Sequence, residues 1–208
     1  MKYVLSVTFT EPAEGLLPRV PRELGAHLSR MRDFHANGTL LMSGAFRTPG
    51  EPLSTMGVFT TQDAAHAFAN GDPFIMNGIA AGWDICAWNE MVPEPSRDAP
   101  VLPIKYVLSF VTRYQSLDEA VVQAPDDIRA HTARTSEFHG RGQILMAGAL
   151  LAPDGPLTTM AIFPSRGSAE DFANGDPFVL KGMVDSWRIR EWNDVVAQAP
   201  ATTPGSAV

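Results

Sequence analysis

An internal repeat constrains this chain more than any other feature. The heptapeptide FANGDPF stands at residues 68–74 and again at residues 172–178, an offset of 104 positions (172 − 68) in a chain of 208 residues. Around this anchor, residues 20–92 align with residues 124–196 without a gap, and roughly 30 of these 73 pairs are identical. A similarity of this size implies that the two halves share one fold.

The hydrophobic pattern predicts the element order βαββαβ in each half. A helix from Pro21 to Asn37 presents one apolar stripe and ends at Gly38, and a second helix ends at Asn70-Gly71. Residues 11–20 read as a proline-rich loop, and the second half repeats the first helix at residues 125–141. The predicted strands are residues 2–10, 39–46, 53–59 and 83–92, and then 105–112, 143–151, 157–163 and 187–196.

Both faces of the predicted strands are largely apolar, so each sheet needs cover on both sides. Helices cover one face, and the sheet of the other half is the simplest cover for the second face. The sequence therefore predicts an α+β fold, in which two tandem ferredoxin-like βαββαβ domains pack as an intramolecular pseudo-dimeric α+β barrel. The predicted parts are a first domain at 1–92, a Pro-rich linker at 93–104, a second domain at 105–197 and a disordered tail at 198–208.

Charge and composition exclude several classes of partner. A net charge of -7 disfavours nucleic acid and anionic membrane surfaces, and no apolar run approaches the length of a membrane span. The single cysteine, Cys86, excludes an internal disulfide and is expected to be a buried, inert thiol. These features favour a cytoplasmic protein with a small-molecule partner, and they leave further homo-oligomerisation open.

Motif searches predict no cofactor and no metal. The chain has no Cys-x-x-Cys and no His-Glu-x-x-His pattern, which disfavours zinc. Gly140-Arg141-Gly142 follows a helix instead of a strand, so it does not fit a dinucleotide loop. No phosphate-binding loop and no Gly-x-Ser-x-Gly elbow occur.

Two repeated residue types remain as candidates for chemistry. His27 and His131 lie on the apolar stripe of the first helix in each half, where an imidazole either satisfies the core or transfers protons. Asp72 and Asp176 precede a proline, which suits a helix N-cap, and their second carboxylate oxygen can orient a histidine. The four residues are therefore candidate catalytic residues as two His–Asp pairs.

The helix stripe differs between the halves near the histidine. Met31 in the first half is replaced by Thr135 in the second, and Thr132 also lies beside His131. A smaller and more polar side chain predicts a roomier pocket around His131, with Thr132 and Thr135 as candidate substrate-binding residues. The tryptophans are interpreted as barrel core or, alternatively, as pocket wall, which adds two more candidates, Trp187 and Trp192.

The spacing of His27-Leu28, Leu40-Leu41, Gly44 and Asp72-Pro73-Phe74 resembles the YCII-related family, here as a tandem pair over about residues 2–92 and 105–196. The resemblance implies a dimeric α+β barrel whose active site combines the helix histidine with an aspartate. Similar barrels include chloromuconolactone dehalogenases, muconolactone isomerases and cofactor-free oxygenases. The family often has an arginine three residues before the histidine, where this chain has Leu24 and Ile128; Arg22 or Arg30 is the candidate replacement.

The leading hypothesis is a cofactor-independent small-molecule enzyme that uses His/Asp acid–base chemistry, of the isomerase, cyclase or HX-eliminating lyase (dehalogenase) type. One alternative is a non-catalytic protein that binds a small ligand or serves as an accessory protein. Another is a cofactor-free oxygenase.

Overall fold

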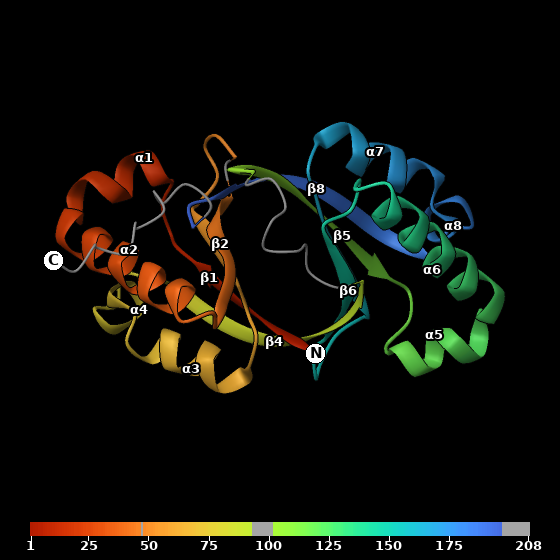
Figure 1. The fold of residues 1–208 in the computed structure, drawn as a ribbon, viewed down its shortest axis with the longest axis horizontal. Coiled ribbons are helices and arrows are strands. Elements are labelled where there is room, and N and C mark those ends of the chain that lie inside the picture. The colour runs from red at the N-terminus through yellow and green to blue at the C-terminus, as the bar shows by residue number, and fades with distance from the viewer. Residues whose placement is uncertain (47, 93–101, 197–208) are drawn as a thin grey trace, which may run out of the picture.

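The computed structural model describes residues 1–46, 48–92 and 102–196. It has an α+β fold in which strands form the centre and helices lie on two opposite sides (Figure 1). Most of the predicted linker, at residues 93–101, and the predicted tail at 198–208 lie outside the described residues. No helix in the described ranges is long and apolar enough to cross a membrane.

In the first half, local sequence signals set the ends of the main elements. Pro21 occupies the first turn of the long helix, and Gly38 follows the helix with a φ of 79°. The elements are β1 (Lys2–Thr8), α1 (Ala13–Leu16), the 3₁₀ helix η1 (Leu17–Arg19), α2 (Pro21–Ala36), β2 (Leu40–Phe46), β3 (Ser54–Phe59), α3 (Gln62–Asn70), α4 (Pro73–Met76) and β4 (Gly82–Val92).

The second half repeats this order, with the single helix α5 in place of α1 and η1. Its elements are β5 (Ile104–Thr112), α5 (Leu117–Gln123), α6 (Pro125–Gly140), β6 (Met146–Leu151), β7 (Thr158–Phe163), α7 (Arg166–Gly175), α8 (Pro177–Leu180) and β8 (Val184–Asp194). The prediction of a plain loop at residues 11–20 is wrong, because α1 and η1 lie there, and α5 was not predicted. In Figure 1, α1 lies beside α2 and α5 lies beside α6.

The strands form one closed barrel in the order β1-β3-β2-β8-β5-β7-β6-β4, and β4 pairs back with β1. Each half contributes four neighbouring strands, β4-β1-β3-β2 and β8-β5-β7-β6. The two halves meet along two seams, where β2 pairs with β8 and β4 pairs with β6, in both cases antiparallel. Closure removes the unpaired edges that two separate sheets would expose.

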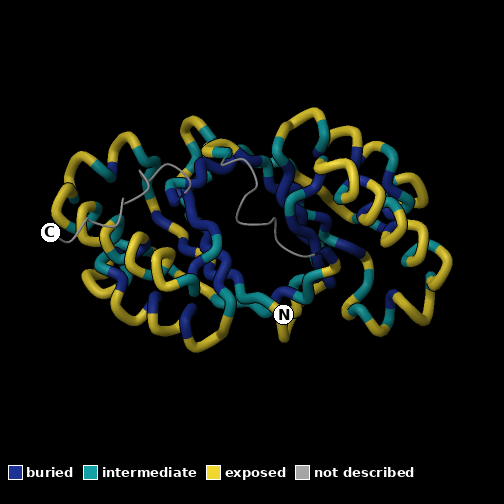
Figure 2. The backbone as a smooth tube through the Cα atoms, in the orientation of Figure 1, coloured by how far each residue is buried: buried dark blue, intermediate teal, exposed yellow. Residues whose placement is uncertain are grey.

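The three largest regions of core among the described residues follow from this arrangement. One core fills the first half between its helices and its strands, and another does the same in the second half. The third core lies inside the barrel and takes side chains from both halves: Val4, Met42, Met56, Val58, Trp88, Val107, Met146, Met160, Ile162 and Trp192. The face of each sheet away from its helices is therefore buried against the other half, as predicted, and Figure 2 shows burial concentrated in the strands.

Candidate functional site

In the second half, the structure brings His131 and Asp176 together. His131 lies on α6, Asp176 is the N-cap of α8, and the imidazole Nδ1 lies 2.7 Å from Asp176 Oδ2. The other carboxylate oxygen, Oδ1, accepts a hydrogen bond from the backbone N–H of Phe178 at 2.9 Å. Asp176 is therefore both a helix cap and the partner of the histidine. Because an ionised carboxylate can only accept, Nδ1 of the neutral imidazole carries the proton and Nε2 is left as an acceptor.

The first half has the same arrangement. His27 Nδ1 contacts Asp72 Oδ2, and Asp72 Oδ1 accepts from the backbone N–H of Phe74 at 3.0 Å. The rings around the histidines differ slightly. His131 stacks on Phe178 with ring centroids 4.2 Å apart and an interplanar angle of 8°, whereas His27 is tilted by 36° against Phe74 at 4.8 Å.

An arginine on the long helix fixes the repeated heptapeptide against the histidine. Arg134 donates from Nε to the Phe172 carbonyl at 3.2 Å and from Nη2 to the Asp171 carbonyl at 2.6 Å. A Cβ at Gly175 would lie 2.5 Å from Arg134 Nη2, so a larger residue there would displace the guanidinium. Asp176 follows directly, and its position relative to α6 is therefore set by this contact.

The matching Arg30 donates to the carbonyls of Phe68 and Ala67 in the first half. Nε and Nη2 of Arg30 thus serve backbone carbonyls, and the suggestion that Arg30 binds an anion in place of the missing family arginine stays a prediction. Sequence reasoning missed this structural role. The signal that could have found it is an arginine three residues after the histidine in both halves.

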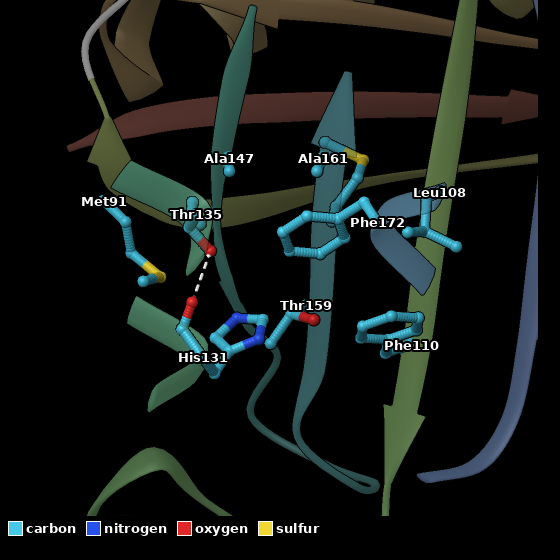
Figure 3. A pocket seen from close by; sticks show the side chains of 11 residues that line it. Met91, Leu108, Phe110, His131, Thr135, Ala147, Thr159, Ala161 and Phe172 are labelled. Atoms are coloured by element: carbon cyan, nitrogen blue, oxygen red, sulfur yellow. Dashed lines mark hydrogen bonds between the residues drawn. The ribbon is translucent and has the colours of Figure 1, made fainter. Parts of the chain in front are cut away.

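A cavity lies beside His131, between α6 and the sheet (Figure 3). In the present packing it has room for about one water molecule. Three of its lining side chains are polar, those of His131, Thr135 and Thr159. The rest of the wall is formed by Met91, Leu108, Phe110, Ala147, Gly148, Met160, Ala161 and Phe172.

The expected difference between the halves appears at this cavity. Thr135 lines it, is buried, and donates its hydroxyl to the His131 carbonyl at 2.9 Å. The corresponding Met31 is buried in the packed core of the first half, beside His27. The first half nevertheless contributes to the cavity in the second, since Met91 belongs to β4.

Three predicted substrate-binding residues lie elsewhere. Thr132 is exposed, and its hydroxyl donates to the Ile128 carbonyl within the helix at 2.8 Å. It follows His131 by one position, which is about 100° round the helix and away from the cavity. Trp192 is fully buried inside the barrel, and Trp187 is 40% exposed on β8. Neither tryptophan lines the cavity, so only Thr135 among the four predicted residues does.

Two further histidines and the single cysteine lie outside the cavity. His35 and His139 each contact a backbone carbonyl just after the helix, that of Leu40 at 2.9 Å and that of Ile144 at 3.1 Å. Burial raises the pKa of the Cys86 thiol, and the Asp84 carboxylate adds to the rise, which disfavours the reactive thiolate. Within the described ranges, no three His, Cys, Asp or Glu side chains are placed to hold a metal ion.

The chain is an α+β protein with a closed eight-stranded barrel and one His–Asp pair in each half. Residues 107–193, in the second half of the chain, match the family model of the YCII-related domain. The first half repeats its sequence and its His–Asp pair. No curated protein sequence matches the chain significantly.

Solved structures share the fold at low sequence identity. A proposed chlorite dismutase superposes with a TM-score of 0.63 at 12% identity, covering 94% of this chain and 96% of its own. A proposed monooxygenase from Lactobacillus acidophilus has a TM-score of 0.57 at 12% identity, with 92% of each chain covered. A heme-binding protein from Thermus thermophilus also has a TM-score of 0.57 at 12% identity, covering 95% of this chain and 92% of its own.

One of the solved structures with this fold is a heme-binding protein, so haem is the group to test against the cavity beside His131. The cavity does not fit a haem. A macrocycle of four pyrrole rings needs far more space than a pocket with room for about one water. Phe178 stacks on one face of the His131 ring, while Phe110 and Phe172 occupy the cavity wall. A haem could be accommodated only by unpacking these aromatic side chains.

Proposed function

We propose that the protein is a cofactor-independent enzyme that moves protons on a small molecule, as an isomerase, a cyclase or an HX-eliminating lyase of the dehalogenase type. The observation that carries this proposal is the buried His131–Asp176 pair at the wall of an otherwise mostly apolar cavity. A histidine that takes and returns a proton near neutral pH suits all three reactions.

His131 acts as the general base through Nε2. Asp176 keeps the Nδ1 proton in place and stabilises the imidazolium that forms when Nε2 takes a proton from the substrate. In an isomerisation, the same proton returns to a different carbon. In an elimination, the electrons of the broken C–H bond form the new double bond, and the halide leaves with the electrons of its bond to carbon.

The two halves divide the work in this proposal. Each is a ferredoxin-like unit, within residues 1–92 and 105–197, and the strand orders β4-β1-β3-β2 and β8-β5-β7-β6 support that assignment. The second half holds the substrate, because Thr135 borders the cavity where the first half has the larger Met31. The first half closes the barrel and supplies Met91. The net charge of -7 and the single cysteine fit a cytoplasmic location.

An oxygenase that uses no cofactor is a second candidate, supported by the barrel fold shared with a proposed monooxygenase. It predicts consumption of dissolved oxygen with the substrate, whereas isomerisation or elimination predicts none. A purely ligand-binding role predicts that substitution of His131 changes affinity or stability without any reaction to lose.

The test is hydrogen exchange with D2O and halide release, measured by NMR on a panel of cyclic ketones, lactones and halogenated phenols. For any compound that the protein turns over, His131→Ala is expected to slow the reaction by about 10²–10⁴-fold. His27→Ala is the matched control and is expected to cost less. An unchanged rate in His131→Ala refutes the base assignment. Equal losses, or a larger loss from His27→Ala, refute the division between the halves.

A further inference from the structure

The hydroxyl of Thr159 is the unused polar group at the cavity. Thr159 lies on β7 and lines the cavity, and Figure 3 shows its side chain beside the imidazole of His131. Thr135 already donates its hydroxyl to the His131 carbonyl. No part of the described chain makes a hydrogen bond to the Thr159 hydroxyl, although the Thr159 backbone is fixed by pairing with Phe110 and Ala149 on the neighbouring strands. A hydroxyl can donate or accept, so it suits an oxygen on a ligand.

The charge of the cavity wall limits what it can bind. No Lys, Arg, Asp or Glu side chain is among its lining residues. The nearby guanidinium of Arg134 is held by two backbone carbonyls and lies over the Phe138 ring at 4.6 Å, so it does not serve the cavity. An ionised carboxylate would lose its hydration there without gaining a cation, which is costly. The cavity therefore favours a neutral ligand.

The size of the cavity favours a small ligand over a large one. In the present packing, the space inside it is far smaller than the roughly 150 Å³ of an apolar cavity that takes benzene. Only about one water fits in the present packing, so the ligand must displace a side chain. Met91 is the natural candidate, since it lines the cavity, is 37% exposed, and has an unbranched, flexible side chain.

We propose that the cavity at His131 binds a neutral, single-ring molecule carrying a hydroxyl or carbonyl oxygen, and that Thr159 holds this oxygen beside His131. This inference rests on the same site as the proposed function and adds the substrate class and a positioning residue. The Thr159 hydroxyl fixes the orientation of the ring, and the apolar wall of Leu108, Phe110 and Phe172 contacts its faces and edges. Anionic rings, such as benzoates, are rejected because the wall offers them no cation.

The probes are 4-fluorophenol and 4-fluorobenzoate, two rings that differ in charge, with binding to the full chain measured by ¹⁹F NMR titration. The wild-type protein is expected to bind the phenol saturably and the benzoate at least about tenfold more weakly. Thr159→Val removes the hydroxyl and keeps the shape, and it is expected to weaken phenol binding by roughly five- to tenfold. Thr159→Ser, which restores a hydroxyl, is expected to recover most of the affinity.

Thr55→Val is the matched control, because Thr55 is the counterpart of Thr159 in the first half, and it should leave phenol binding unchanged. Three results each overturn the proposal: no saturable phenol binding to the wild type, equal affinity for phenol and benzoate, or unchanged phenol affinity in Thr159→Val. Should Thr159→Val not fold, Thr159→Ala takes its place, since it also removes the hydroxyl, and unchanged phenol affinity in that variant overturns the proposal. Binding is measured without turnover, so a failure here differs from an unchanged reaction rate in His131→Ala.

Discussion

The two seams of the barrel depend on glycines at equivalent positions, Gly44 and Gly148. At Gly44 on β2, an added Cβ would lie 1.8 Å from the backbone oxygen of Asn193 on β8. At Gly148 on β6, the same atom would lie 2.2 Å from the backbone oxygen of Asn89 on β4. An ordinary C···O contact is about 3.3 Å or longer, so the β2–β8 seam would have to widen by roughly 1.5 Å.

Gly44→Ala is therefore expected to lower the free energy of unfolding by at least about 3 kcal/mol. The obstructing atoms belong to the backbone and cannot rotate away, and overpacking in such a place costs about 1–3 kcal/mol or more. The seam pairs Gly44, Ala45 and Phe46 with β8, and each ladder hydrogen bond that is lost removes about 1 kcal/mol more. Trp192, which pairs with Phe46, would also lose part of its burial.

Urea unfolding followed by tryptophan fluorescence measures this loss, because Trp88 and Trp192 lie inside the barrel. The control is Gly25→Ala, in the exposed interior of α2, where nothing lies within 4 Å of the added Cβ. That variant is expected to gain about 0.5–1 kcal/mol from helix propensity. If Gly25→Ala behaves in this way and Gly44→Ala costs less than about 1 kcal/mol, the seam does not close as described.

Three further predictions test the site and the core. Asp176→Asn should keep the cap on α8, because the amide oxygen still accepts from the Phe178 N–H. The rate of the His131-dependent reaction should fall by about 10²-fold or more, because the amide nitrogen cannot accept a hydrogen bond from Nδ1–H of His131. A rate within twofold of the wild type would contradict this. Lys105→Met should cost about 3–5 kcal/mol in urea unfolding, because the Lys105–Asp194 pair (2.6 Å) is buried; a loss below about 1 kcal/mol would count against a buried pair. Cys86 should react with iodoacetamide more slowly than free cysteine at neutral pH, because its raised pKa keeps the thiol protonated. The reaction should become faster only at more alkaline pH. Alkylation at neutral pH as fast as that of free cysteine would contradict this prediction.

The repeat explains why so much of the fold could be predicted. Each strand and each long helix is predicted by two copies of the same hydrophobic pattern, one in each half. The Asp-Pro turn that follows Gly71 also follows Gly175 unchanged. The helix α5 stands where the first half has α1 and η1, but both places lie before the stretch that aligns without a gap, residues 20–92 with 124–196, so this support was missing. A local signal did exist, since Ser116 caps the helix and accepts from the Glu119 N–H three residues later at 3.1 Å.

The residues around the histidine were harder to place, because the side of an element on which a residue lies depends on tertiary packing. The sequence leaves Trp192 as barrel core or, alternatively, pocket wall, and its alternation along β8 places it inside the barrel with Trp88. Thr159 was not proposed at all, since a threonine in a strand has a typical β propensity and carries no other mark. Its role becomes visible only when β7 is placed beneath α6.

The seam and the cavity share residues, which ties the site to the closed barrel and not to one half. Gly148 pairs with Glu90 across the β4–β6 seam and also lines the cavity, and Met91 follows Glu90 on β4 and lines the cavity as well. A separate second half would lack the Met91 side of the wall. The duplicated first half therefore has a use even without a reaction of its own, because its last strand completes the site at His131.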